Sequence, residues 1–228
     1  MVLVLEYYTP KNENRNNEYL FCIRENINRK LFNEINIFVE NGSTLPDDIT
    51  SSGLVKIHNG DRKNIQGLID FCNESLVGEI CFIVNTDIFF DESINLVNER
   101  NIEGRFLALT RWNIVAQNKA NFFDNQNGIS VFSQDTWIFK SPIAIKDANF
   151  YMGKPGCDNK LAYLAKQAGL SVRNPSKGLK SYHLHLSNYR TYTPGGKETV
   201  PPPYLGIVAT NNINRDPEYR WLGKNPEL

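Results

Sequence analysis

The protein contains 228 residues, enough for one large domain or two small ones with a substantial buried core. It has the composition of a globular protein, with 41% hydrophobic and 22% charged residues, and its 25 basic residues balance its 25 acidic ones. This balance gives no sign of a nucleic-acid-binding protein, and no apolar run approaches the roughly 20 residues that span a bilayer.

The first hundred residues predict alternating strands and helices. The strand-like segments contain unbroken apolar runs such as "VLVL" and "CFIV", and the helix-like segments carry apolar residues at helical spacing. Uninterrupted apolar strands are typical of a mainly parallel sheet that helices cover on both faces. The predicted strands lie in residues 1–10, 35–42, 53–60 and 79–84, and the predicted helices in residues 16–31 and 61–75, the second with Asp61 as its N-cap.

The pattern changes after residue 100. Two strand-like segments, 104–113 and 129–143, are separated by the polar stretch 116–128, which predicts a loop or an insertion. Asp158 and Gly169 mark the start and the end of a helix whose apolar face is clear, and residues 179–190 predict a further strand.

The C-terminal segment, residues 193–228, contains "TPGG" and "VPPPY" and predicts little regular structure. We expect it to form either an arm that wraps the preceding domain or a linker.

The four cysteines, Cys22, Cys72, Cys81 and Cys157, show no CxxC spacing; Cys22 and Cys72 lie in predicted helices and Cys81 lies in a predicted buried strand. They predict reduced core thiols rather than disulfides or a zinc site, which favours a reducing compartment. The N-terminal segment "MVLVLEYY" lacks a basic leader and includes the acidic Glu6, which argues against a signal peptide. We therefore expect a cytoplasmic protein.

Asn85, Thr86 and Asp87 directly follow the most apolar strand. In open parallel sheets, ligands bind beyond the carboxyl ends of the strands. Asp87 is therefore either the cap of a turn or a carboxylate that holds a divalent cation against a diphosphate, since hard cations prefer oxygen ligands.

Three further groups are candidates for chemistry. Asp158 follows the Gly- and Pro-rich "GKPGC", where it serves either as an N-cap or as a general base. His183 and His185 are two residues apart on a predicted strand, so they share a face, which suggests a metal or phosphate site; the alternative is that each is a packed or surface side chain, as a single histidine more often is. Asp135 and Trp137 also share a strand face. A carboxylate beside an aromatic ring is common in sugar-binding sites, but Trp137 can equally be a core residue.

The order of "NTDIFFD", "ALTRW", "SQDTWIFKSPI", "GCDNKLAYLAKQAGLSVRNP" and "YHLHLSNYR" resembles that of nucleotide-sugar-dependent glycosyltransferases of the GT-A fold. The resemblance covers residues 1–192 and is strongest to a small group from bacteria and large DNA viruses, including the N-terminal domain of the chlorella-virus capsid glycosyltransferase. It implies an α/β GT-A domain over residues 1–192, with a Rossmann-like donor-nucleotide half in 1–100 and an acceptor-binding, catalytic half in 101–192.

The resemblance also implies roles for individual residues. "NTD" corresponds to the DxD motif, so Asp87 binds Mn²⁺ or Mg²⁺ on the donor diphosphate, with Asn85 in the place of the first acid. "GCDN" corresponds to the catalytic base of inverting members, which makes Asp158 the base and Asp135 its competitor, and His183 or His185 completes the metal shell. The implied nucleotide-sugar-binding residues are Thr9, Asp61, Arg62, Asn85, Thr86, Asp87, Arg111 and Arg190.

We therefore expect a metal-dependent, inverting glycosyltransferase. It would move a sugar from a nucleotide-sugar, with uridine the expected base and a deoxyhexose such as rhamnose one candidate, to a hydroxyl of a glycan or glycoprotein. If the chain is viral, it would act on capsid protein in the host cytoplasm, and it can be part of a longer multidomain chain. The alternatives are a non-catalytic nucleotide-sugar- or glycan-binding module and a sugar nucleotidyltransferase. The segment after the first strand, "TPKNENRNNE", lacks the Gly-rich loop of the latter.

Overall fold

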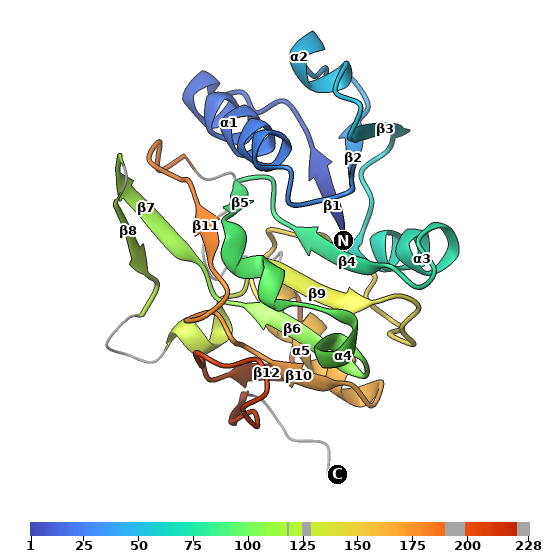
Figure 1. Ribbon diagram of the computed structural model, residues 1–228, viewed down its shortest axis with the longest axis vertical. Coiled ribbons are helices and arrows are strands. Elements are labelled where there is room, and N and C mark those ends of the chain that lie inside the picture. The colour runs from blue at the N-terminus through green and yellow to red at the C-terminus, as the bar shows by residue number, and fades with distance from the viewer. Residues whose placement is uncertain (118, 125–128, 190–198, 223–228) are drawn as a thin grey trace.

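The computed structural model describes residues 1–117, 119–124, 129–189 and 199–222. Its centre is a seven-stranded sheet in the order β10-β6-β9-β4-β1-β2-β3, in which only β9 runs antiparallel to its neighbours (Figure 1). The prediction of a mainly parallel α/β sheet is confirmed. The strands are β1 (Val2–Tyr7), β2 (Glu34–Glu40), β3 (Val55–Gly60), β4 (Ile80–Val84), β6 (Arg105–Leu109), β9 (Thr136–Lys140) and β10 (Ser171–Arg173).

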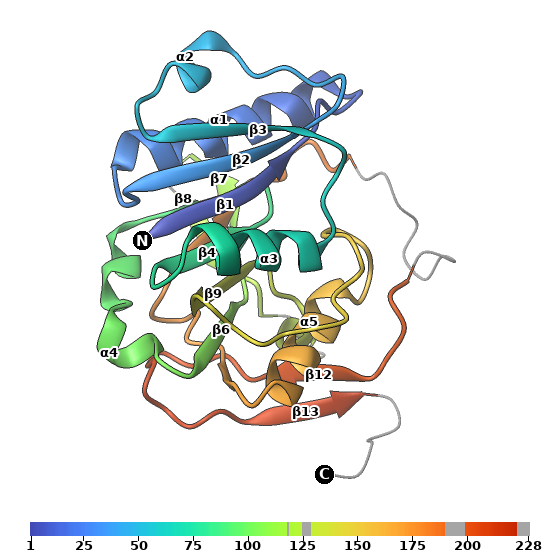
Figure 2. The same cartoon turned by 90° about the vertical axis from the view of Figure 1, so that its right-hand side faces the viewer.

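Helices cover both faces of this sheet (Figure 2). The helix α1 (Glu13–Arg29) packs on one face, and α3 (Ile65–Ser75) and α5 (Cys157–Gln167) pack on the other. Successive residues of β1 therefore enter different cores, and every one of its residues is buried. This two-sided burial explains the unbroken apolar runs. Two shorter helices, α2 (Asp47–Thr50) and α4 (Glu99–Ile102), and the 3₁₀ turns Glu92–Leu96 and Ile129–Phe132 complete the helical elements among the described residues.

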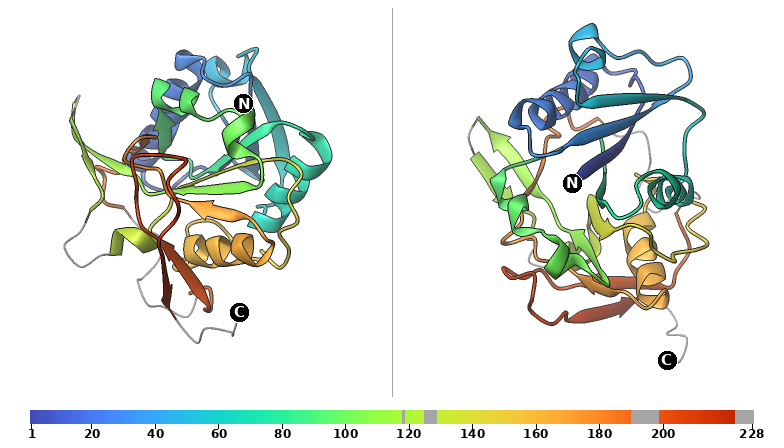
Figure 3. Two further views of the ribbon diagram at one scale, coloured as in Figure 1. Left: turned by 60° about the horizontal axis from the view of Figure 1, so that its bottom comes forward. Right: turned by 45° about the vertical axis from the view of Figure 1, so that its right-hand side comes forward.

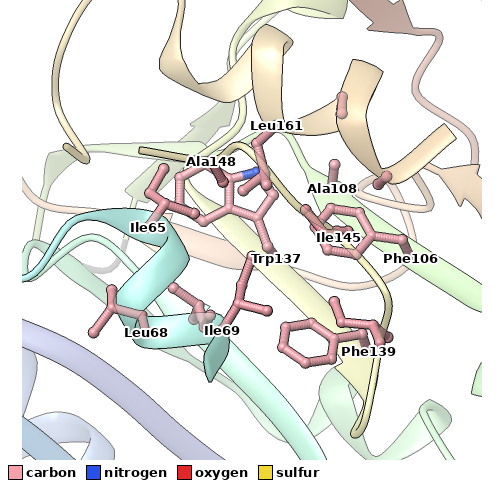
Figure 4. Close-up of a cluster of buried hydrophobic side chains, with 14 of the residues drawn as sticks. Ile65, Leu68, Ile69, Phe106, Ala108, Trp137, Phe139, Ile145, Ala148 and Leu161 are labelled. Carbon is pink, nitrogen blue, oxygen red and sulfur yellow. The ribbon is translucent and has the colours of Figure 1, made fainter. Parts of the chain in front are cut away.

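Trp137 lies in the core rather than in a sugar site. Its side chain is 1% exposed, and Figure 4 shows the indole between Ile65 of α3, Ala148 and Leu161 of α5. The four cysteines are free and buried, as predicted. In the part of the chain that the structure describes, no helix is long and apolar enough to cross a membrane.

A second, four-stranded sheet stands beside the main one in the order β5-β11-β7-β8 (Figure 1). The predicted loop 116–128 is partly wrong, because β8 pairs with β7 as a hairpin. The strand predicted over residues 179–190 is shorter than expected, because β11 ends at His183. The four strands of this second sheet are β5 (Ile88–Phe90), β7 (Trp112–Ala116), β8 (Lys119–Phe122) and β11 (Ser181–His183).

Two predicted helix caps are wrong. Asn64, not Asp61, caps α3, because its side chain accepts a hydrogen bond from the backbone N–H of Gly67 at 2.8 Å. Gly156, with a φ of 84°, occupies the N-cap of α5, so Asp158 does not cap the helix and its carboxylate makes other contacts. Gly169, also in the left-handed region, follows the end of α5 as predicted.

The C-terminal segment contains a hairpin of β12 (Tyr204–Ile207) and β13 (Tyr219–Leu222), which lies beside α5 (Figures 2 and 3). Val200, Leu205 and Ile207 are buried in the same core as α5. The predicted arm also includes residues 193–198 and 223–228, which lie outside the described residues.

Candidate functional site

The candidate site lies at one edge of the large sheet, where several strand ends meet. β1 and β4 are parallel neighbours, so their carboxyl ends, followed by Tyr8 and Asn85, lie together. β9 is antiparallel to β4 and β6, so its beginning, next to Asp135, reaches the same edge. Here β2 and β3 extend the sheet on one side of β1, and β4 lies on the other. Open α/β sheets bind ligands at such a switch point.

A cavity of about 400 Å³ opens at this edge. The structure brings together in its walls most of the residues predicted for donor and metal binding, namely Arg62, Asn85, Thr86, Asp87, Arg111, Asp135, His183 and His185. Thr9 and Asp61 do not line it. Both are exposed, and they bond Ser43 and Asn41 respectively. Arg190 lies outside the described residues.

Asp87 is the centre of a buried charge cluster. Its Oδ2 accepts a hydrogen bond from Arg15 and lies 3.0 Å from Nε2 of His183. Burial alone would raise the pKa of Asp87, but the charges of His183 and Arg15 hold it well below its ordinary range. Asp87 is therefore a carboxylate at neutral pH, which a cation-binding group must be.

The hydrogen bonds of the two histidines determine which ring nitrogens carry protons. Nδ1 of His183 lies 3.0 Å from Oδ1 of Asn113, and that oxygen also accepts from Nε of Arg111, so the imidazole Nδ1 is the donor. Nε2 of His185 donates to the carbonyl of Tyr189 at 2.9 Å. A ligating histidine is held in the same way by an acceptor on its other nitrogen.

These bonds leave Nε2 of His183 and Nδ1 of His185 as the nitrogens available to a cation. Nε2 of His183 faces the Asp87 carboxylate, an arrangement that requires either a second proton on the ring or a metal between the two groups. Ligand atoms of Asp87, His183 and His185 all lie within 4.8 Å of one another, and Oδ1 of Asp87 is buried without a hydrogen-bond partner among the described residues. Two imidazole nitrogens and one carboxylate form a donor set for a first-row divalent cation.

Arg15 and Glu18 of α1 are site residues that the sequence patterns did not predict. Arg15 also donates to the carbonyl of Leu184 and to Glu18, and Glu18 accepts from both the backbone N–H and the hydroxyl of Ser187. The two side chains thus tie the segment after β11, which carries His185, to α1. The sequence feature that could have revealed Arg15 and Glu18 is their helical spacing from Tyr19 and Cys22, which places them on the buried face of α1.

A second cavity, of about 250 Å³, adjoins the first, and Asp158 lines it. The two cavities share Asn85, Arg111 and Asp135 in their walls. Asp158 is partly buried, and its Oδ2 accepts a hydrogen bond from the backbone N–H of Gln134 at 3.1 Å. Burial, together with the negative charge of Asp135, raises the pKa of Asp158 to about 7.

Asp135 has partners that Asp158 lacks. Its Oδ2 accepts from Arg111 and its Oδ1 from the side-chain amide of Asn85, each at 2.8 Å. Both carboxylate oxygens of Asp135 are therefore already occupied by hydrogen-bond donors. The side-chain amide of Asn85, which stands in the place of the first acid of the DxD motif, is turned toward Asp135.

The raised pKa of Asp158 has a consequence for stability. A carboxyl group whose pKa rises from 3.8 to about 7 on folding destabilises the folded state as pH increases through that window. We expect Asp158→Asn to raise the melting temperature, with an increment that grows between pH 4 and pH 7 and stays constant above it. Thermal denaturation across this range measures it, with Asp216→Asn, at a 99% exposed side chain, as the control. A constant increment would contradict the prediction.

No protein-family model matches the chain, and no curated protein matches it. Several solved structures do. A form of S. aureus TarS containing residues 1–349, in complex with UDP-GlcNAc, has a TM-score of 0.56 at 9% identity, over 81% of this chain. The mannosyltransferase PcManGT from Pyrobaculum calidifontis, in complex with GDP-Man and Mn²⁺, has a TM-score of 0.50 at 14% identity, over 84% of this chain.

The chain spans 58% of the length of each of these two structures. At such identities the likeness concerns the fold. The protein has the GT-A-type fold of these neighbours, a mixed α/β fold with a large central sheet flanked by helices.

Proposed function

We propose that the protein is a metal-dependent, inverting glycosyltransferase that uses a nucleotide-sugar donor. The observation that carries this proposal is the pair of adjoining cavities on a GT-A-type fold. One contains the Asp87–His183–His185 cluster, the other contains a carboxyl group whose pKa is near 7, and they meet at Asn85, Arg111 and Asp135. A donor and an acceptor in these cavities would meet at the shared wall.

On the donor side, Asp87, His183 and His185 would hold a divalent cation such as Mn²⁺. When bound, the cation would neutralise the charge that develops on the leaving diphosphate. Arg111, which lines both cavities, would add positive charge near the bond that breaks. Asp135 orients Arg111 through their ion pair.

On the acceptor side, we assign Asp158 as the general base. The acceptor hydroxyl oxygen would attack the anomeric carbon from the side opposite the diphosphate, as the carbon–oxygen bond to the diphosphate breaks. The hydroxyl proton would pass to Asp158. A base is most effective when its pKa lies near the working pH, and Asp158 meets this condition.

The proposal is tested with a thermal-shift screen of UDP-, GDP-, dTDP- and CMP-sugars, each with and without Mn²⁺. The nucleotide-sugars that raise the melting temperature are then incubated with candidate glycans and glycoproteins, and release of the nucleotide is measured. A donor that binds and is consumed only with an acceptor supports a transferase. Binding without turnover by any acceptor or water would favour a catalytically silent binding module.

Removal of a metal ligand gives a separate prediction. We expect Asp87→Asn and His183→Ala each to weaken Mn²⁺ binding by at least tenfold, because each removes one of three protein ligands. Titration calorimetry with Mn²⁺ measures the affinity in the absence of donor. His58→Ala, at the remaining histidine on β3, is the matched control and keeps wild-type affinity. Undiminished binding by both site variants would exclude this cluster as the metal site.

The transferred sugar, the acceptor, the cytoplasmic location and the division at residue 192 stay predictions, as does the resemblance to the viral capsid glycosyltransferase. The expectation that the donor contains uridine also depends on that resemblance.

A further inference from the structure

The strand β12 lies behind the wall of the smaller cavity, next to α5 (Figure 2). It contacts two of the segments that line this cavity but contributes no lining residue itself. The first contact is with the turn before α5. Gly156 of this turn lines the cavity, and a Cβ on it would lie 2.8 Å from the hydroxyl oxygen of Tyr204 and 3.0 Å from the carbonyl oxygen of Val200. Tyr204 and Val200 are therefore packed directly against the backbone of the turn.

Two hydrogen bonds connect β12 to the same turn. The hydroxyl of Tyr204 donates to the carbonyl of Val200, and the backbone N–H of Val200 donates to the carbonyl of Pro155 at 2.9 Å. Val200 is buried in the core that also contains residues of α5. Asp158 lies two residues after Gly156, so a movement of the turn would also move its carboxylate.

The second contact is with Phe132, which also lines the smaller cavity. A Cβ at Gly206 would lie 2.5 Å from Cε1 of Phe132, closer than two carbon atoms approach, so the ring lies against the bare backbone of β12. Leu205 and Ile207, on either side, are fully buried and fix the strand in place. A side chain at position 206 would displace the ring of Phe132 toward the cavity.

We propose that β12 is part of the acceptor site and that Tyr204 is a positioning residue, which holds the turn before α5 and thereby aims Asp158 into the cavity. Tyr204 lines neither cavity, so it acts on the base through the turn. The inference rests on the proposed function. It makes residues 199–222 a component of the site rather than an arm or a linker.

The ionisation of the two side chains agrees with this arrangement. Burial and the charge of Asp158 both raise the pKa of Tyr204, so the two groups lie near each other. Loss of the Tyr204 ring would admit water to the turn, and the pKa of Asp158 should then fall from about 7 toward its ordinary value. Other ionisable groups around Asp158, which this change leaves in place, are Asp135, Arg111, Lys154 and the thiol of Cys157.

This fall is measured without any substrate. Asp158→Asn is made in the wild-type chain, in Tyr204→Ala and in Tyr204→Phe, and the increment that it adds to the melting temperature is followed from pH 4 to pH 8. In the wild type the increment should stop growing near pH 7. In Tyr204→Ala it should stop growing on the order of one pH unit lower, because the carboxyl group is less buried. The loss of packing itself lowers both members of each pair and cancels.

Tyr204→Phe keeps the ring and loses only the bond to Val200, so its increment should behave more like that of the wild type than that of Tyr204→Ala. Glu218→Gln, at a 67% exposed side chain of the same C-terminal segment, is the control and keeps the wild-type end point. An unchanged end point in Tyr204→Ala, or an equal fall in Glu218→Gln, would overturn the inference.

Turnover provides the second measurement. Tyr204→Ala should lower kcat at pH 7 by about tenfold or more without changing donor affinity, because the base is displaced. Gly206→Ala should raise KM for the acceptor by about tenfold, and Phe132→Leu in the same chain should restore it. An unaltered acceptor KM in Gly206→Ala, or weaker donor binding in either variant, would contradict the inference. If no nucleotide-sugar is turned over, the proposed function fails, whereas the melting series still decides whether Tyr204 holds the turn.

Discussion

Asp158→Asn should lower the turnover of sugar transfer by roughly 10²–10⁴-fold, the usual contribution of a general base. The amide keeps the shape of the side chain but cannot take the proton from the acceptor hydroxyl. Donor affinity should remain, because Asp158 lines the second cavity and not the first. Steady-state kinetics of nucleotide release, with calorimetry of the donor, separate the two effects.

The pH dependence provides the stricter test. A base with a pKa near 7 must be deprotonated to act, so wild-type turnover should rise with pH through about 7 and level off above it. Asp158→Asn should lose this rise. Asp135→Asn should keep it but move it to lower pH, because the charge of Asp135 contributes to the raised pKa of Asp158. If Asp135→Asn instead abolishes the rise, the base is Asp135.

Arg15→Met should destabilise the fold by roughly 3–5 kcal/mol, the cost of leaving buried charges without their partner. Arg15 and Asp87 are each about nine-tenths buried, and Arg15 is also bonded to Glu18. Methionine fills a similar volume but supplies no donor. Urea unfolding at pH 7 measures the difference, and Mn²⁺ should restore part of it if the ion neutralises Asp87.

Arg24→Met on the same helix is the matched control. Arg24 pairs with Asp48 at 2.6 Å, but both side chains are largely exposed, so the expected cost is much smaller than that of Arg15→Met. The double variant Arg15→Met/Asp87→Asn should recover stability relative to Arg15→Met alone, because it removes one of the stranded charges. Equal costs for Arg15→Met and Arg24→Met would show that the buried pair is not specially coupled.

The elements of the large sheet were predictable wherever burial on both faces left a continuous apolar run, as in β1 and β4. β8 was not, because its residues alternate between exposed and half-buried on a short edge strand and carry weak strand signals. The strand at 179–190 was overextended for a different reason. The N–H of Leu184 still bonds to the carbonyl of Asp87, in register with β5, but the N–H of Ser187 bonds to the side chain of Glu18, and a local pattern does not reveal such a partner.

The candidate site was predictable to the extent that its residues follow strands or precede helices. Asp87, Asp158 and the histidines stand at such positions. Arg15 meets Asp87 across 72 residues of chain, and a lone arginine in a polar helical stretch resembles a solvated one. Thr9 and Asp61 were predicted from the family resemblance, but the backbone N–H of Thr9 donates to the hydroxyl of Ser43, and the carboxylate of Asp61 accepts from the side-chain amide of Asn41.

The shared wall of the two cavities has a consequence for how such a protein can diversify. Apart from that wall and the adjoining Gly153 and Lys154, the smaller cavity is lined by Phe123, by residues 132–134 and by residues 155–159, which belong to loops, a 3₁₀ turn and the start of α5 rather than to the sheet. Substitutions in loops change little in the scaffold that carries them. If the protein is the glycosyltransferase proposed above, substitutions around the smaller cavity should change the acceptor more readily than the donor.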